Sequence, residues 1–107
     1  MIIRGTTPKL TFTVDPEINL NQVVELCITL RPVSKSTSKK DKNYYKEDVT
    51  IDPAEHIITL TLSQTDTLYI TTSTCQCQLK LKLSDGNVYA SDVYEEPVGK
   101  VLNTGEI

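Results

Sequence analysis

The chain has 107 residues and a formal net charge of −3. This length suits one small domain and excludes folds such as the (β/α)8 barrel, which needs about 250 residues. Four scattered glycines are too few for a phosphate-binding glycine-rich loop, whereas fifteen threonines, which are β-branched, favour an all-β fold.

Apolar and polar residues alternate with a period of two along most of the chain, which predicts about seven short strands. These strands are expected at residues 9–14, 23–31, 44–51, 58–62, 75–83, 87–94 and 97–102. Turn sequences such as Asp15-Pro16 and Asp85-Gly86 separate them, and Pro32 is expected to end the second strand. The positions predicted to face the core include Leu10, Phe12, Val14, Val24, Leu26, Ile28, Leu30, Val88 and Ala90.

One short helical turn is expected at residues 64–68, because Ser63 can cap it and Asp66 lies near its positive end. Leu68 would then pack under a sheet. This pattern predicts an all-β fold, an antiparallel immunoglobulin-like β-sandwich of about seven strands. A small closed barrel is the alternative. Residues 1–102 are expected to form the single domain, and residues 103–107 a loosely held tail.

The three cysteines, Cys27, Cys75 and Cys77, are an odd number and do not suggest a disulfide framework. Cys75 and Cys77 lie on the same face of one strand, and we interpret all three cysteines as reduced, buried, small apolar residues. Reduced thiols favour folding in a cytoplasm. The sequence begins without a signal-peptide pattern and has no apolar run of about 18 residues, so we expect an unprocessed protein outside the membrane.

Charge is unevenly distributed: residues 1–46 carry eight Lys/Arg and four Asp/Glu (+4), and residues 47–107 carry three and ten (−7). The basic part includes a polar loop at residues 33–43. Its candidate contact residues, with the aromatic residues that follow, are Lys39, Lys40, Lys42, Tyr44 and Tyr45. Lysines beside aromatics can bind single-stranded nucleic acid, but an acidic domain is a poor general nucleic-acid binder. We favour a flexible hairpin tip that could dock on an acidic surface, including that of another copy.

No catalytic set of side chains can be assembled from the sequence. His56 is the only histidine and follows a turn, so we expect a solvated turn residue rather than a general base or a zinc ligand. Asp92, Glu95 and Glu96 form an acidic cluster near the C-terminus. Their spacing does not match a calcium loop, and we expect Glu95 and Glu96 to lie on a partner-facing acidic edge. No cofactor or metal is predicted.

Five sequence blocks occur in order: residues 1–8 (MIIRGTTP), 62–68 (LSQTDTL), 83–86 (LSDG), 90–92 (ASD) and 98–102 (VGKVL). Together they resemble small virion structural proteins encoded by phages and prophages of Gram-positive gut bacteria. The layout is also similar, more loosely, to the N-terminal β-sandwich of phage baseplate upper proteins. The resemblance spans about residues 1–102, and the long loop at 33–43 departs from it because a shorter hairpin is expected there.

The resemblance implies a non-enzymatic virion component in the tail, baseplate or capsid decoration, made in the host bacterial cytoplasm. Its partners would be other virion proteins and further copies of itself. Two alternatives stay open. One is a module that binds carbohydrate or a host surface through exposed aromatics, with Tyr44, Tyr45, Tyr69, Tyr89 and Tyr94 as candidates. The other is a small regulatory or nucleic-acid-binding phage protein.

Overall fold

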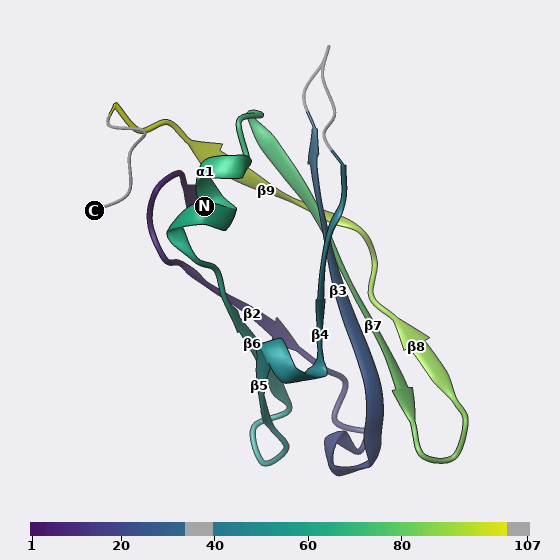
Figure 1. Ribbon diagram of the computed structural model, residues 1–107. Helices are drawn as coiled ribbons and strands as arrows, with labels where there is room; N and C mark the ends of the chain where they lie inside the picture. Colours follow the sequence, from purple (N-terminus) through teal and green to yellow (C-terminus); the bar gives the residue numbers. More distant parts are fainter. Residues whose placement is uncertain (34–39, 103–107) are drawn as a thin grey trace.

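The computed structural model describes residues 1–33 and 40–102, which form two packed β-sheets (Figure 1). The larger sheet has the order β1-β9-β7-β3-β4, with β8 also paired to β7, and the smaller has the order β2-β6-β5. The strands are β1 (Ile2–Ile3), β2 (Lys9–Thr13), β3 (Val23–Val33), β4 (Lys42–Tyr45), β5 (Val49–Asp52), β6 (Ile57–Thr61), β7 (Thr74–Leu83), β8 (Val88–Ala90) and β9 (Tyr94–Gly99). The helical elements are the 3-10 turns η1 (Leu20–Gln22) and η2 (Lys46–Asp48), and helix α1 (Gln64–Tyr69). The predicted all-β sandwich is confirmed.

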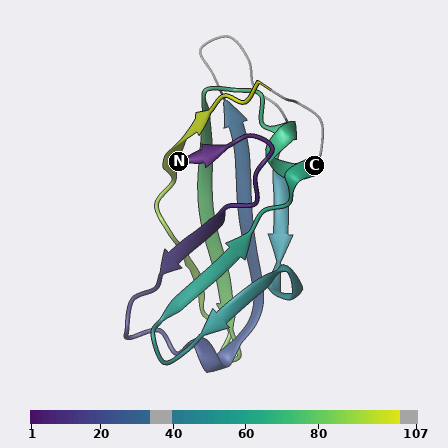
Figure 2. The same ribbon diagram turned by 90° about the vertical axis from the view of Figure 1, so that its left-hand side faces the viewer.

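The first strand is an element that the alternation pattern missed. β1 pairs in parallel with β9, Ile2 opposite Val98, so the larger sheet is mixed rather than purely antiparallel. The chain then crosses to the smaller sheet and continues as β2 (Figure 2). Gly5 lies at this crossing with a φ of +76°, a conformation that glycine adopts without steric cost. A two-residue strand is too short to show a period.

The single strand predicted at residues 44–51 is wrong. The chain forms β4 in the larger sheet, turns through η2, and enters the smaller sheet as β5. The turn consists of three exposed charged residues, and Asp48 Oδ2 accepts a 2.9 Å hydrogen bond from the Tyr45 backbone N–H. Alternation of side chains continues across such a turn by coincidence, so the sequence pattern hides the change of sheet.

Two predictions for the second strand also need correction. A register shift between Val23 and Glu25 buries Val23 and leaves Val24 48% exposed, so Val24 does not face the core. Pro32 does not end β3, which continues to Val33. Among the described residues the β4 ladder stops at Leu30, so one side of β3 lacks a partner beyond it, and a proline without an N–H is tolerated there.

The strand predicted at 87–94 is shorter than expected, and β8 and β9 share β7 as partner. β8 pairs with the end of β7 and β9 with its beginning. Ser91 fills the interruption: its Oγ accepts a 2.9 Å hydrogen bond from the Leu79 backbone N–H, as a strand carbonyl would. Val88 and Ala90 are exposed rather than core residues, because their register on β7 puts them beside outward-facing Lys82 and Lys80.

Helix α1 begins where the capping pattern predicts. The Ser63 hydroxyl accepts a 3.1 Å hydrogen bond from the Asp66 backbone N–H. Thr67, rather than Leu68, is the fully buried residue of the helix, and Leu68 is only half-buried. The Thr67 hydroxyl accepts from the Gly5 N–H at 3.0 Å and lies 2.9 Å from the Thr6 carbonyl, so α1 fixes the crossing between β1 and β2.

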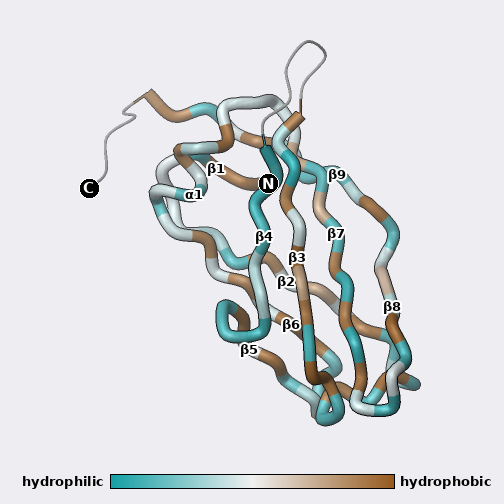
Figure 3. The backbone as a smooth tube through the Cα atoms, turned by 45° about the vertical axis from the view of Figure 1, so that its right-hand side comes forward, coloured by the Kyte–Doolittle hydropathy of each residue, from teal (hydrophilic) through white to brown (hydrophobic). Residues whose placement is uncertain are grey.

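The core lies between the two sheets and consists of apolar side chains. Hydrophobic and hydrophilic residues alternate along strands such as β7 (Figure 3). Phe12 of β2 packs against Tyr94 of β9 across the sandwich, with ring centroids 5.8 Å apart. Core side chains include Leu10, Phe12, Leu26, Ile28, Leu30, Ile58, Leu60, Leu62, Leu79, Leu81 and Leu83. With the inner faces occupied, the larger sheet presents its other face to solvent.

Candidate protein-interaction surface

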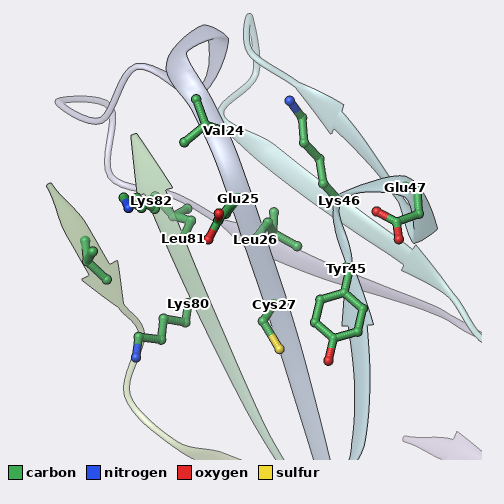
Figure 4. A pocket seen from close by; sticks show the side chains of 11 residues that line it. Val24, Glu25, Leu26, Cys27, Tyr45, Lys46, Glu47, Lys80, Leu81 and Lys82 are labelled. Carbon is green, nitrogen blue, oxygen red and sulfur yellow. The ribbon is translucent and has the colours of Figure 1, made fainter. Parts of the chain in front are cut away.

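A groove of about 610 Å³ lies on the outer face of the larger sheet, the face opposite the core (Figure 4). We call it the outer-face groove. It is lined by Val24, Glu25, Leu26, Cys27, Tyr45, Lys46, Glu47, Lys80, Leu81, Lys82 and Val88. These residues come from β3, β4, β7, β8 and η2, so segments far apart in sequence combine to form it.

Strand register arranges the side chains of the groove in rows. One row runs from Tyr45 on β4 through Cys27 on β3 and Lys80 on β7 to Ala90 on β8. The next row places Glu25 opposite Lys82, and Val88 beyond it. Side chains in such a row are neighbours on one face, at separations of about 5 Å between Cβ atoms.

The groove exposes an unusual amount of apolar surface for the outside of a sheet. Val24 is 48% exposed, Tyr45 is 50% exposed and Val88 is 53% exposed. The bulge in β3 is responsible for Val24, and the β8 register for Val88. The three side chains come from β3, β4 and β8, and Glu25, Lys80 and Lys82 lie between them. Exposed apolar side chains beside charged ones are typical of interaction sites.

The charges of the groove are largely unpaired. Among the described residues no ion pair within 4.0 Å involves Glu25, Lys80 or Lys82. Lys46 differs, because its ammonium donates a 2.9 Å hydrogen bond to the Val23 carbonyl. Unpaired, exposed charges of both signs are available to a partner without the loss of an existing contact.

At the other end of the same sheet face, two opposite charges pair within the chain. Arg31 donates two hydrogen bonds, of 2.7 and 2.9 Å, to the carboxylate of Asp41. The hydrogen bonds lower the pKa of Asp41 and raise that of Arg31. A partner that used Arg31 or Asp41 would have to compete with this pair, in contrast to Glu25 and Lys82.

The basic and aromatic residues predicted as one contact patch do not form one. Lys39 lies outside the described residues. Lys40 is exposed, but the Lys42 ammonium lies 3.0 Å from Asp66 Oδ1 and 4.9 Å from the centre of the Tyr69 ring. Tyr44 is half-buried and donates a 2.9 Å hydrogen bond to Asp66 Oδ2.

Lys42 and Tyr44 therefore connect β4 to α1 inside the molecule. Burial, reinforced by Asp66, raises the pKa of Tyr44. Burial alone would raise the pKa of Asp66, but the hydrogen bonds from Lys42 and Tyr44 outweigh it and lower that pKa. Of the predicted basic and aromatic residues, Tyr45 is the one that reaches the outer-face groove.

The predicted acidic edge is divided between two sides of a strand. Glu95 is exposed on the outer face opposite Gln76. Glu96 is half-buried on the other side, where its Oε2 lies 3.2 Å from the Met1 amino group. Asp92 is exposed in the segment between β8 and β9. The three carboxylates therefore do not offer one surface to a partner.

The cysteines are free thiols, and Cys75 and Cys77 are completely buried, as predicted, whereas Cys27 is only half-buried. The two core thiols donate long hydrogen bonds to backbone carbonyls, Cys75 to Gln76 at 3.8 Å and Cys77 to Cys75 at 3.7 Å. The neighbouring Cys75 thiol and burial raise the pKa of Cys77. His56 lies in a turn with a φ of 56° and is half-buried; its Nδ1 is buried without a hydrogen-bond partner. Among the described residues, no three His, Cys, Asp or Glu side chains are grouped to hold a metal ion.

Alternation along residues 23–31 and 75–83 is enough to turn Cys27, Lys80 and Lys82 away from the core, but it does not place them side by side. That requires knowing that β3 and β7 are neighbours. Val24 and Val88 were assigned to the core: the register of β8 leaves no mark in the alternation, and the bulge leaves only one. The adjacent pair Val23-Val24 was the available signal, because two consecutive apolar residues break the period.

Comparison with protein-family models, with curated proteins and with solved structures finds no match to this chain. The structure itself gives the class, an all-β sandwich, with a candidate site on the exposed face of its larger sheet. In the part of the chain that the structure describes, no helix is long and apolar enough to cross a membrane.

Proposed function

We propose that the protein is a structural component of a phage virion, in the tail, baseplate or capsid decoration, and acts by protein–protein assembly without catalysis. The phage assignment is supported by the resemblance of the five sequence blocks. The assembly role is supported by the outer-face groove, where Val24, Tyr45 and Val88 are exposed beside unpaired charges. Burial of such exposed apolar side chains by a partner is favourable, because it removes them from water.

Analysis of phage particles purified from the bacterial host tests this proposal. The chain should be found in washed particles by mass spectrometry, at a fixed ratio to the major capsid protein. A chain that stays in the particle-free lysate contradicts the proposal.

A pair of lysine variants tests the role of the groove. Tyr45→Lys puts a charge into the groove and should reduce incorporation into particles. Val93→Lys is a control with a similarly exposed side chain, 56%, outside the groove, and it should be incorporated normally. Equal incorporation of both variants would contradict the role of this surface.

A carbohydrate-binding module is the second candidate, and one observation favours it. Tyr45 offers a half-exposed ring in a groove that also contains the carboxylates of Glu25 and Glu47. Tyr44, Tyr69 and Tyr94 are half-buried and offer less, and Tyr89, which is 40% exposed, does not line this groove. Two results together would favour this candidate over the first. The chain binds host cell-wall glycans, and Tyr45→Ala abolishes that binding. The chain is also not incorporated into particles.

A further inference from the structure

We propose that the outer-face groove binds a second copy of this chain, forming a symmetric dimer of facing sheets. This inference rests on the proposed assembly function and specifies one partner for it. The strands themselves supply the symmetry, because β3 and β7 carry opposite charges at paired positions: Glu25 lies directly across from Lys82.

A twofold axis that runs parallel to the strands, midway between β3 and β7, exchanges these two strands between copies. Glu25 of each copy then faces Lys82 of the other. The two charges that lack an ion pair within the described part of the chain thus gain one across the interface, and they do so twice. Because the negative Glu25 and the positive Lys82 lie on opposite sides of this axis, the surface is complementary in charge to a second copy of itself.

The same rotation brings apolar groups together. Tyr45 lies one strand beyond β3, and Ala90 lies one strand beyond β7 in the same row. Tyr45 of one copy therefore faces Ala90 of the other, next to Val88. Cys27 faces the aliphatic stem of Lys80, which can cover it while the ammonium reaches water.

The size of the face indicates a reversible dimer. The four strands that carry the groove, β3, β4, β7 and β8, contain 28 residues. At about 4.8 Å by 3.3 Å for each residue, this face covers roughly 440 Å² per copy, and two such faces give about 900 Å², the size of a weak, transient contact. The axis runs between β3 and β7, so the contacts between Glu25 and Lys82 lie beside it.

Charge reversal tests the geometry. In a dimer of the Glu25→Lys variant, the introduced lysine of each copy meets Lys82 of the other, and Lys82→Glu likewise brings two glutamates together. Each variant alone should associate at least about tenfold more weakly than the native chain, because the like charges meet twice. Mixed in equal amounts, the two variants should restore association. In a dimer with one copy of each, the two introduced charges face each other at one contact, and the native Glu25 and Lys82 face each other at the second.

Sedimentation equilibrium over a wide concentration range provides the measurement. The native chain should approach twice the 12.0 kDa chain mass, the mixture should associate more strongly than either variant, and each variant alone should remain near one chain mass. Glu17→Lys and Lys9→Glu repeat the same charge changes at exposed positions outside the larger sheet and should associate like the native chain. Circular dichroism confirms that each variant is folded.

A native chain that stays monomeric, or a mixture that associates no better than its components, would overturn the dimer. Particle incorporation is measured separately. A monomer that is still incorporated into particles overturns this inference and leaves the proposed function standing, with another virion protein on the groove. A dimer that is not incorporated into particles supports this inference and contradicts the proposed function.

Discussion

Tyr44 Oη lies 2.9 Å from Asp66 Oδ2, and this hydrogen bond joins β4 of the larger sheet to helix α1. The other carboxylate oxygen of Asp66 accepts from Lys42 at 3.0 Å. Asp66 thus holds two residues of β4, and the next helix residue, Thr67, holds the crossing between β1 and β2. A helix of six residues fixes one end of the sandwich.

We expect Tyr44→Phe to lower the free energy of unfolding by about 1–2 kcal/mol, because it leaves the Asp66 carboxylate with one hydrogen bond fewer. Tyr45→Phe removes an exposed hydroxyl and should change it by less than about 0.5 kcal/mol. Urea unfolding measures both. The double variant Tyr44→Phe/Asp66→Asn should lose less than the sum of its single changes, and strict additivity would show that the hydrogen bond contributes nothing.

The same carboxylate makes stability depend on pH in the acid range. The pKa of Asp66 in the folded chain is below its ordinary value of 3.8, so its charged form stabilises the fold. This contribution is complete above the unfolded pKa and is lost as the pH falls through the folded one. The difference in unfolding free energy between the native chain and Asp66→Asn should be constant near neutrality and shrink below about pH 4.

Thermal unfolding of both proteins at a series of pH values provides the measurement. Lys42→Met removes a main cause of the lowered pKa, so in that background the pH-dependent part should be smaller. A difference that grows on acidification would reverse the sign and contradict the assignment.

Thr67 provides a test in which shape is conserved. Thr67→Val keeps the side-chain volume but leaves the Gly5 N–H and the Thr6 carbonyl without this partner. We expect a loss of about 1–3 kcal/mol, while Thr67→Ser, which keeps the hydroxyl, should lose less. Thr11→Val at an exposed position of β2 is the matched control. Equal stability of Thr67→Val and Thr11→Val would show that these bonds do not fix the crossing.

Two apolar residues of β3, Ile28 and Val24, should contribute very differently to the free energy of unfolding, because the bulge leaves Val24 outside the core. Ile28 is completely buried, so Ile28→Ala should cost about 2–5 kcal/mol through lost burial and a cavity. Val24 is exposed, and Val24→Ala should cost less than about 1 kcal/mol in the monomer. Chemical denaturation at low protein concentration measures both, and a large loss for Val24→Ala would place Val24 in the core.

The sequence predicts the fold well where local chemistry determines the structure. The alternation at 75–83 and the Ser63 cap correspond directly to β7 and α1. The remaining features depend on contacts between distant segments. The parallel β1–β9 pair, the change of sheet at η2 and the bulge after Val23 are set by tertiary packing, which a period of two does not encode.

The candidate site shows the same division. Outward positions such as Lys80 and Lys82 follow from alternation alone, whereas their position beside Glu25 follows only from the order of strands. Lys42 and Tyr44 have the composition of a contact patch, but Asp66, 22 residues or more away in the sequence, holds both within the molecule.

The native thiols give the most direct test of the outer-face groove as an assembly surface. Cys27 is half-buried within the groove, while Cys75 and Cys77 are completely buried in the core. An alkylating reagent should therefore modify Cys27 alone in the dilute, folded chain, and all three thiols after unfolding. In intact particles we predict that Cys27 is protected, and that release of the chain restores its reactivity. Equal modification of Cys27 in the particle and in the released chain would contradict the account.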